Sequence, residues 1–307
     1  MIGMLPTPHA QFPFGGLFMK LYTCQSADGN SFLAVSFTDS LYSLDQFGVN
    51  VPDMQTLIDQ FADIRPLLVP NDSLKPLDTG AIRLCAPIPY PRQDIICLGI
   101  NYTAHAEEAD RFDSDAFGGE RPKAIYFSKR ACPMTGDGDP IPSYPGLVTR
   151  LDYECELGVV IGKDAFQISP EQAADYIFGY TIINDVSARN LQTAHKQWYF
   201  GKSLDGFTPC GPCIVTADDI PFPPALNIRC TVNGELRQDS NTAYLINSIA
   251  SVIAELSQGM TLRAGTIIAT GTPAGVGMGL EPPQFLKTGD TVVCEIEGIG
   301  TLTNVVD

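Results

Sequence analysis

The sequence predicts an α+β protein in which a mixed sheet or roll follows a smaller N-terminal α+β domain. Beyond residue 92 the chain is a series of short apolar runs broken by Gly, Pro and Asn, with few helical segments between them. Regular alternation of strands and helices would instead indicate a doubly wound parallel sheet. A Pro-rich stretch at residues 86–91 separates residues 1–85 from the rest, as a linker between two domains would.

Periodicity and turn residues predict the individual elements. Residues 1–18 are uncharged and rich in Pro and Gly, so a flexible extension is expected there. In the small domain, residues 19–85, we expect a strand at 32–37 and an amphipathic helix at 54–64, because Leu57, Phe61 and Ile64 recur at helical spacing. The larger domain, residues 93–307, is expected to have helices near 104–111, 170–176 and 246–257, and strands at 95–100, 124–128, 154–161, 179–184, 213–216, 228–232, 266–269 and 291–296.

Charge and composition exclude several classes of function. The net charge of −16 argues against a nucleic-acid or anionic-membrane surface, since both require clustered Lys and Arg. No apolar stretch reaches the 18 residues or so that a membrane-spanning helix needs. Nine scattered cysteines, an odd number, suit buried thiols in a reducing compartment. We therefore expect a soluble cytoplasmic protein; a mitochondrial location stays open, although no transit peptide is visible.

Two carboxylates in one apolar strand are the most informative local feature. Side chains alternate between the two faces of a strand, so Glu154 and Glu156 point the same way while Cys155 and Leu157 take the other face. Because like charges repel, two such carboxylates usually have a positive group between them. A hard divalent cation, which prefers oxygen ligands, is one such group. A solvated strand edge is the alternative.

A third carboxylate favours the metal. The apolar run at 179–183 stops at Asn184 and Asp185, so Asp185 is expected at a strand end, where a sheet delivers side chains into a site. Three carboxylates without a Cys or His ligand suit Mg²⁺ or Mn²⁺ rather than Zn²⁺ or copper.

Other candidate groups are weaker when taken singly. His105 and Glu108 are three residues apart at the start of a predicted helix, so Glu108 can orient the imidazole; a surface His beside an acid is the alternative. Lys202 could steady a carboxylate or a developing enolate, or it could be a surface lysine. The Cys210-x-x-Cys213 pair precedes a strand rather than opening a helix, which argues against a thioredoxin-type redox motif. The Gly-rich run 270–277 lacks the P-loop and dinucleotide spacings and suits close backbone approach to a small acid.

In order and spacing, five motifs closely resemble the fumarylacetoacetate hydrolase (FAH) superfamily over residues 93–307. These motifs are residues 99–102 with His105 and Glu108, and residues 152–157, 184–189, 201–205 and 270–277. The N-terminal part resembles the smaller domain of the longer, domain-2-like and oxaloacetate-decarboxylase-like members. The resemblance implies a mixed β-roll catalytic domain, a homodimer, and Mg²⁺ or Mn²⁺ held by Glu154, Glu156 and Asp185.

The resemblance also implies roles for further residues. His105 and Glu108 would form an acid–base dyad on a lid that orders over the substrate, with Lys202 as the nearby cation. Arg189, Gln192 and Thr272 fall where the family contacts its substrate. Asn190 departs from the pattern, which usually has Asp there, and we expect this change to alter the surroundings of the metal. The polar segment 107–123 is the expected lid.

The implied substrates are 2-oxo acids and 1,3-dicarbonyl acids, converted through a metal-bound enolate. C–C bond hydrolysis of acylpyruvates or fumarylpyruvate and decarboxylation of oxaloacetate are the leading reactions. The alternatives are keto–enol tautomerisation of oxaloacetate or isomerisation of a dienoate. A non-catalytic small-acid binding protein would have lost a dyad or metal residue, and none is lost. A thiol oxidoreductase is the remaining rival and would need a reactive Cys210.

Overall fold

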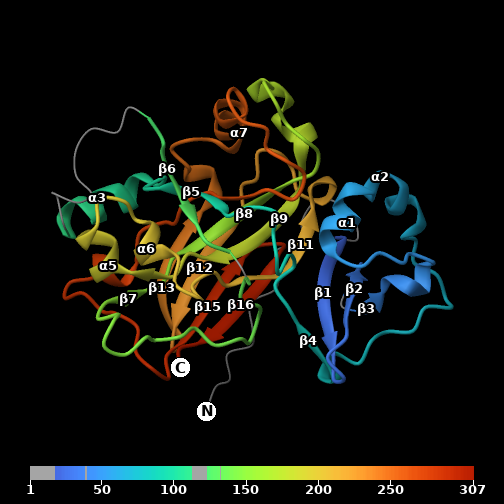
Figure 1. Cartoon of the computed structure of the whole chain (residues 1–307), viewed down its shortest axis with the longest axis horizontal. Coiled ribbons are helices and arrows are strands. Elements are labelled where there is room, and N and C mark those ends of the chain that lie inside the picture. Colours follow the sequence, from blue (N-terminus) through green and yellow to red (C-terminus); the bar gives the residue numbers. More distant parts are fainter. Residues whose placement is uncertain (1–17, 39, 113–122, 132) are drawn as a thin grey trace, which may run out of the picture.

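The framework of the computed structural model, which describes residues 18–38, 40–112, 123–131 and 133–307, is one ten-stranded mixed sheet (Figure 1). The order is β3-β2-β1-β11-β9-β8-β14-β5-β6, with β4 paired to β1; only β14 and β5 run parallel. The predicted α+β class with a mixed sheet is confirmed. The strands of this sheet are β1 Lys20–Ser26, β2 Ser31–Ser36, β3 Leu41–Ser43, β4 Ile82–Leu84, β5 Ile95–Gly99, β6 Ile125–Lys129, β8 Cys155–Ile161, β9 Ile177–Asn184, β11 Cys210–Thr216 and β14 Ile267–Ala269.

A second, four-stranded antiparallel sheet packs against β8 and β9 and encloses the larger core. Its order is β13-β12-β15-β16, with β12 Asn227–Val232, β13 Glu235–Asn241, β15 Thr291–Ile296 and β16 Gly300–Val305. Two further short strands, β7 Leu151–Asp152 and β10 Ser187–Ala188, form an antiparallel pair. The sequence analysis missed β13 and β16, because each is rich in polar residues and has one largely exposed face.

The helices are short and differ from prediction at their ends. They are α1 Met54–Asp59, α2 Phe61–Ile64, α3 Thr103–Phe112, α5 Arg189–Ala194, α6 Tyr199–Lys202 and α7 Ile249–Ser257. The single helix expected at 54–64 is two helices, because the backbone leaves helical geometry at Gln60 (φ −110°, ψ 11°). The helix α7 begins at Ile249, where the Ser248 hydroxyl accepts a hydrogen bond from the Ser251 amide at 3.2 Å. The expected helix at 170–176 is a 3₁₀ helix.

The N-terminal part continues the main sheet. Strand β1 pairs with β11, and residues on both sides of the Pro-rich stretch share one core (Figure 1). Within the stretch 86–91, where a linker is expected, Ala86 and Ile88 are buried in the shared core. The division into a small domain at 19–85 and a catalytic domain at 93–307 stays a prediction. The flexible extension expected at 1–18 lies outside the described residues, apart from residue 18.

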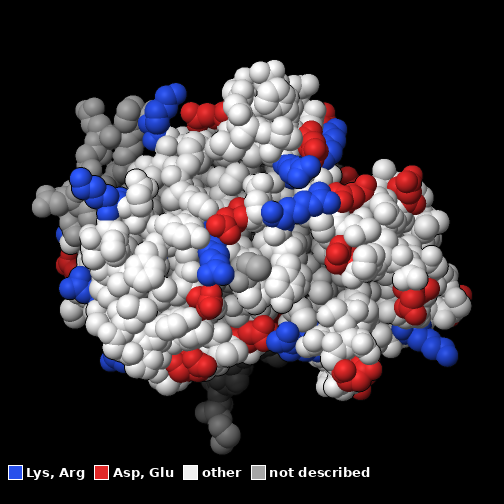
Figure 2. All heavy atoms as spheres, viewed as in Figure 1, with Lys and Arg blue, Asp and Glu red and all other residues white. Residues whose placement is uncertain are grey.

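Acidic and basic side chains are interspersed on the surface. On the face seen in Figure 2, Lys and Arg alternate with Asp and Glu and do not form a continuous patch. Within the described parts of the chain, every helix is too short or too polar to cross a bilayer.

Candidate active site

Alternation along β8 places the two glutamates as predicted. Leu157, Val159 and Ile161 belong to the core under the four-stranded sheet, whereas Val160 belongs to the core on the other side. Glu156 therefore shares its face with Val160, and Glu154, just before the strand, lies with it. Both glutamates are buried, with 5% and 1% of their surfaces exposed. The alternative of a solvated strand edge is wrong.

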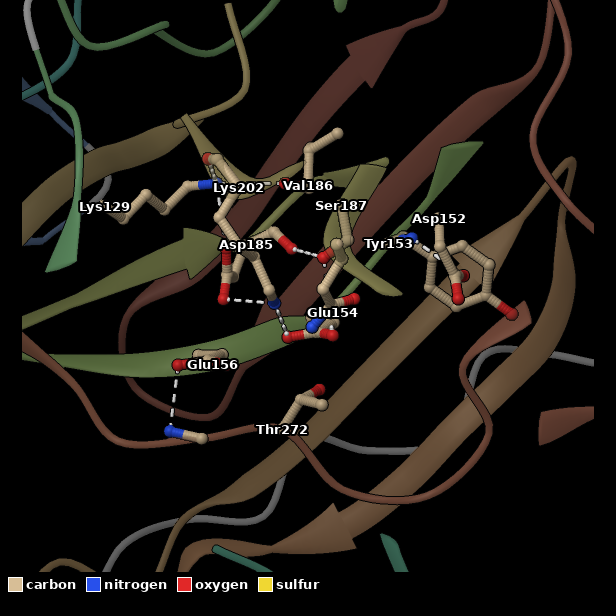
Figure 3. Close-up of polar contacts among 12 residues, drawn as sticks. Lys129, Asp152, Tyr153, Glu154, Glu156, Asp185, Val186, Ser187, Lys202 and Thr272 are labelled. Carbon is tan, nitrogen blue, oxygen red and sulfur yellow. Dashed lines mark hydrogen bonds and ion pairs between the residues drawn. The ribbon is translucent and has the colours of Figure 1, made fainter. Parts of the chain in front are cut away.

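The third carboxylate, Asp185, directly follows β9, as the sequence predicts. Antiparallel pairing puts Cys155 opposite Asn184, so the end of β9 lies next to the start of β8. The Asp185 amide donates to the Glu154 carbonyl at 2.8 Å. Oxygen atoms of Glu154, Glu156 and Asp185 all lie within 4.8 Å of one another (Figure 3).

Buried cations surround two of these carboxylates. The Lys202 ammonium donates to Glu154 and to Asp185, each at 2.7 Å (Figure 3). Arg189 contacts Glu154 at 2.6 Å, and Lys129 contacts Asp185 at 2.8 Å. The pKa of Glu154 lies below its ordinary value, because Lys202, Arg189 and His105 outweigh the opposing effect of burial.

Sequence reasoning missed Lys129 and Asp152. Lys129 ends β6, with its side chain fully buried and its ammonium also bonded to the Val186 carbonyl at 3.0 Å. Asp152 is fully buried and accepts from Arg189 at 2.9 Å and from the amides of Gly277 and Met278 at 2.7 and 3.0 Å. Asp152 lies two residues before Glu154 and so repeats the spacing between Glu154 and Glu156. This spacing is the sequence feature that could have identified it.

The donor set fits a hard divalent cation. Glu156 accepts from the Gly271 amide at 2.8 Å, and among the described residues no cationic side chain forms an ion pair with it. Burial raises its pKa well above the ordinary value, and Asp185 and Glu154 raise it further. Around it, the buried acids Glu108, Asp152, Glu154, Glu156 and Asp185 outnumber the buried cations Lys129, Arg189 and Lys202, even when His105 is counted as a cation. A divalent ion would balance this excess with its preferred oxygen ligands.

The predicted dyad is formed within α3. His105 Nδ1 lies 2.9 Å from Glu108 Oε2, and each residue is 4% exposed, so the alternative of a surface His is wrong. Glu108 Oε1 accepts from the Gly275 amide at 2.9 Å. The two residues therefore meet within the helix, as their spacing of three residues allows. Residues 113–122 of the expected lid, 107–123, lie outside the described residues.

The Gly-rich run 270–277 approaches the carboxylates of the protein itself. Its amides at Gly271, Gly275 and Gly277 donate to Glu156, Glu108 and Asp152, respectively. Gly275 has φ +103°, and a Cβ there would lie 1.9 Å from the Arg237 carbonyl oxygen, so both the backbone conformation and the packing require glycine. The same loop thus holds both Glu156, a residue of the candidate metal site, and Glu108, a residue of the dyad.

A pocket lies among these groups. The expected substrate contacts Arg189, Gln192 and Thr272 all line it, together with His105, Glu154, Glu156 and Lys202. The apolar part of its lining consists of Leu98, Ile100, Ala109, Phe127, Trp198 and Met278. Arg189 Nη2 is buried without a hydrogen-bond partner in the described structure, so this donor is available to a ligand.

Two further expectations can be compared with the structure. Asn190 donates to the Leu147 carbonyl and accepts from the Thr149 amide, at 3.0 and 3.1 Å, so it holds this loop rather than a metal ligand. Cys210 and Cys213 both lie in β11, and burial raises the pKa of their thiols to about 12 and 11. A reactive Cys210 is therefore contradicted, and with it the thiol oxidoreductase.

Comparison with curated proteins and solved structures shows the family to which this chain is similar. The family model described as fumarylacetoacetate (FAA) hydrolase C-terminal matches residues 94–307. The chain is 48% identical over 237 residues to oxaloacetate tautomerase YisK of Bacillus subtilis (strain 168), which covers 76% of this chain and 77% of that protein.

Two solved structures extend the likeness to nearly the whole chain. Fumarylacetoacetate hydrolase (EaFAH) from psychrophilic Exiguobacterium antarcticum has a TM-score of 0.82 at 40% identity, covering 94% of this chain and 99% of that one. Maleylpyruvate hydrolase from Sphingobium sp. SYK-6, in complex with manganese (II) ion and pyruvate, has a TM-score of 0.75 at 30% identity, covering 94% and 98%. This chain belongs to the fumarylacetoacetate hydrolase superfamily.

Proposed function

We propose that this protein is a divalent-metal-dependent enzyme that catalyses keto–enol tautomerisation of oxaloacetate. One observation carries the proposal: His105, which is paired with Glu108, lines the same pocket as Glu154 and Glu156, two members of the carboxylate cluster that could hold a cation. The likeness to oxaloacetate tautomerase YisK supports this reaction among those that the sequence left open. The C–C cleaving reactions that the sequence analysis ranked first stay predictions.

The chain's own groups can move the proton. Glu108 engages His105 Nδ1, so Nε2 is the imidazole nitrogen left to exchange a proton with substrate. In tautomerisation, one proton leaves the carbon next to the 2-oxo group and one proton arrives on the carbonyl oxygen. Glu108 is itself fixed by the Gly275 amide, which holds the imidazole orientation between the two transfers.

Positive groups that line the pocket can bind the acid. Oxaloacetate carries two carboxylates, and the buried Arg189 Nη2 supplies a free N–H donor inside the pocket. A divalent cation held by Glu154, Glu156 and Asp185 would supply Lewis-acid stabilisation of negative charge on the 2-oxo acid. Lys202, fixed between Glu154 and Asp185, stabilises the same region.

Hydrolysis of an acylpyruvate is the second candidate. A water molecule activated by His105 would attack the distal carbonyl, and the likeness to maleylpyruvate hydrolase supports this reaction. For the ion we propose Mg²⁺ or Mn²⁺. The named relatives are bacterial, which supports a bacterial cytoplasm as the compartment. We also propose a homodimer, with no nucleic-acid or membrane partner; light scattering of the purified protein tests the dimer.

Proton NMR of the purified protein with Mg²⁺ distinguishes the reactions. Oxaloacetate and acetylpyruvate are supplied in separate samples, and each is compared with Mg²⁺ in buffer alone. Faster keto–enol exchange of oxaloacetate without new products supports tautomerisation. Pyruvate and acetate from acetylpyruvate indicate C–C hydrolysis, and pyruvate and CO₂ from oxaloacetate indicate decarboxylation. Exchange no faster than in buffer would contradict the proposed reaction.

Gly279→Ala is expected to disable the dyad without unfolding the protein. A Cβ at residue 279 would lie 1.9 Å from the Glu108 carboxyl group, and Gly279 does not have a positive φ. Because the buried Glu108 side chain has to shift, the free energy of unfolding should fall by about 1 to 3 kcal/mol, which leaves the protein folded. Turnover should fall about tenfold or more, because Glu108 no longer orients the imidazole.

Gly259→Ala is the matched control for this variant, since nothing lies within 4 Å of a Cβ at that position and its φ is not positive. Steady-state kinetics and thermal melts of both variants make the test. Wild-type turnover in folded Gly279→Ala would show that the position of Glu108 does not matter.

A further inference from the structure

A second cavity lies apart from the catalytic pocket and includes Arg237, whose backbone packs against Gly275 of the Gly-rich loop. It is bounded by the hairpin between β12 and β13 and by the segment 283–290. None of its lining residues lines the catalytic pocket. They are Thr149, Tyr153, Val232, Asn233, Arg237, Pro283, Gln284, Phe285, Leu286, Lys287 and Asp290.

Arg237 is the distinctive group in this cavity. Its side chain is only 11% exposed, and its Nε is buried without a hydrogen-bond partner in the described structure. Nη2 pairs with Glu235 at 3.0 Å, but that carboxylate is 67% exposed, and such pairs contribute little to stability. A buried guanidinium with an unused donor is costly unless an acceptor reaches it.

The remaining charges of the cavity leave Arg237 available to an anion. Asp290 is occupied, because it accepts from the Asn233 side chain and from the Lys287 amide, each at 2.8 Å. The Lys287 side chain is exposed at the rim and adds a second positive charge. Val232, Pro283, Phe285 and Leu286 supply an apolar wall.

Neighbouring residues of the chain face the two different cavities. Tyr153 stands between Asp152 and Glu154 in the chain, and Figure 3 shows its ring turned away from the carboxylate cluster. Its hydroxyl donates to the Gly275 carbonyl at 2.8 Å, and the Arg237 backbone packs against the same glycine. The two cavities are thus distinct sites.

We propose that this second cavity is a binding site for a small organic carboxylate with an apolar body. The guanidinium of Arg237 takes the carboxylate through the donor that is now unused, since arginine presents its N–H groups in the fork that carboxylates fit. The apolar wall takes the body of the ligand, which inorganic phosphate lacks. The protein's net charge of −16 disfavours nonspecific anion binding, so retention of an anion here would require this local arrangement.

Benzoate is a suitable probe, with benzamide as its neutral analogue and inorganic phosphate as an anion without an apolar body. Saturation-transfer NMR and calorimetric titration are carried out on the whole protein with saturating Mg²⁺ and oxalate, so that the catalytic pocket is filled. We expect benzoate to bind, and benzamide and phosphate to bind at least about tenfold more weakly, because a hydrogen bond to a charged group is lost or the apolar contact is missing.

Arg237→Gln should weaken benzoate binding about tenfold to a hundredfold. Arg229→Gln is the matched control: it makes the same charge change on the neighbouring strand, at a residue about half exposed that pairs with Asp239 outside the cavity. Should Arg237→Gln fail to fold, Lys287→Gln at the exposed rim is expected to weaken binding severalfold. Equal benzoate affinity in wild type and in the folded Arg237 or Lys287 variant overturns the proposal, as does equal binding of benzamide, or no benzoate binding to the wild type.

Discussion

Removal of divalent metal by EDTA is expected to abolish turnover of oxaloacetate, and added Mg²⁺ or Mn²⁺ is expected to restore it. Glu154, Glu156 and Asp185 present only oxygen ligands within 4.8 Å of one another, which suits hard cations. Without the cation, the buried acids around the pocket exceed the buried bases, so negative charge developing on a substrate would be poorly stabilised. Stopped-flow or NMR rates before and after chelation measure the effect. Full activity after exhaustive chelation would contradict the site.

Glu156→Gln separates the metal from the rest of the pocket. The amide keeps the shape but loses the charge, so metal affinity should fall by about tenfold or more, as loss of a charged ligand predicts. Metal-free Glu156→Gln should melt at the same or a higher temperature than the metal-free wild type, because burial and two neighbouring carboxylates disfavour an ionised Glu156. Glu295→Gln, an exposed acid on β15, is the control and should change neither quantity. A lower melting temperature for Glu156→Gln alone would contradict this account of the charge.

Local rules were enough to place the three carboxylates of the candidate metal site. The alternation of a strand puts Glu154 and Glu156 on one face, and the abrupt end of an apolar run puts Asp185 at the edge of the sheet. Both rules act over a few residues, so they are visible in one sequence. The i to i+3 spacing that joins His105 to Glu108 on α3 is local in the same way.

The groups that the sequence analysis missed depend on contacts between distant segments. Lys129 reaches Asp185 from β6, and Asp152 accepts amides 125 and 126 residues further along the chain. A lone lysine in an apolar run does not reveal a partner that only the folded sheet supplies. The same holds for the Pro-rich stretch at 86–91, where composition indicates a linker but tertiary packing buries Ala86 and Ile88. Strand β16 was missed because half of its side chains face outward and carry little hydrophobic signal.

His105→Ala is expected to lower the rate of oxaloacetate tautomerisation about a hundredfold to ten-thousandfold, the usual contribution of a positioned acid–base group. Metal affinity should stay nearly unchanged, because the cation ligands are carboxylates that come from β8 and β9 rather than from α3. The rate is measured by exchange NMR, and Mn²⁺ affinity by titration of the same samples. His195→Ala is the matched control: this exposed histidine follows α5 and does not line the pocket, so both quantities should match the wild type.

The rates of the different reactions in the His105→Ala variant then distinguish the role of the dyad from that of the charged groups. If His105→Ala abolishes proton exchange and acylpyruvate hydrolysis but leaves any decarboxylation intact, only the first two reactions need an acid–base group. Loss of CO₂ from oxaloacetate requires stabilisation of the resulting negative charge, which Lys202 and Arg189 still provide in the variant. Wild-type rates for all reactions in folded His105→Ala would mean that the buried imidazole orders α3 against the Gly-rich loop and takes no part in proton transfer.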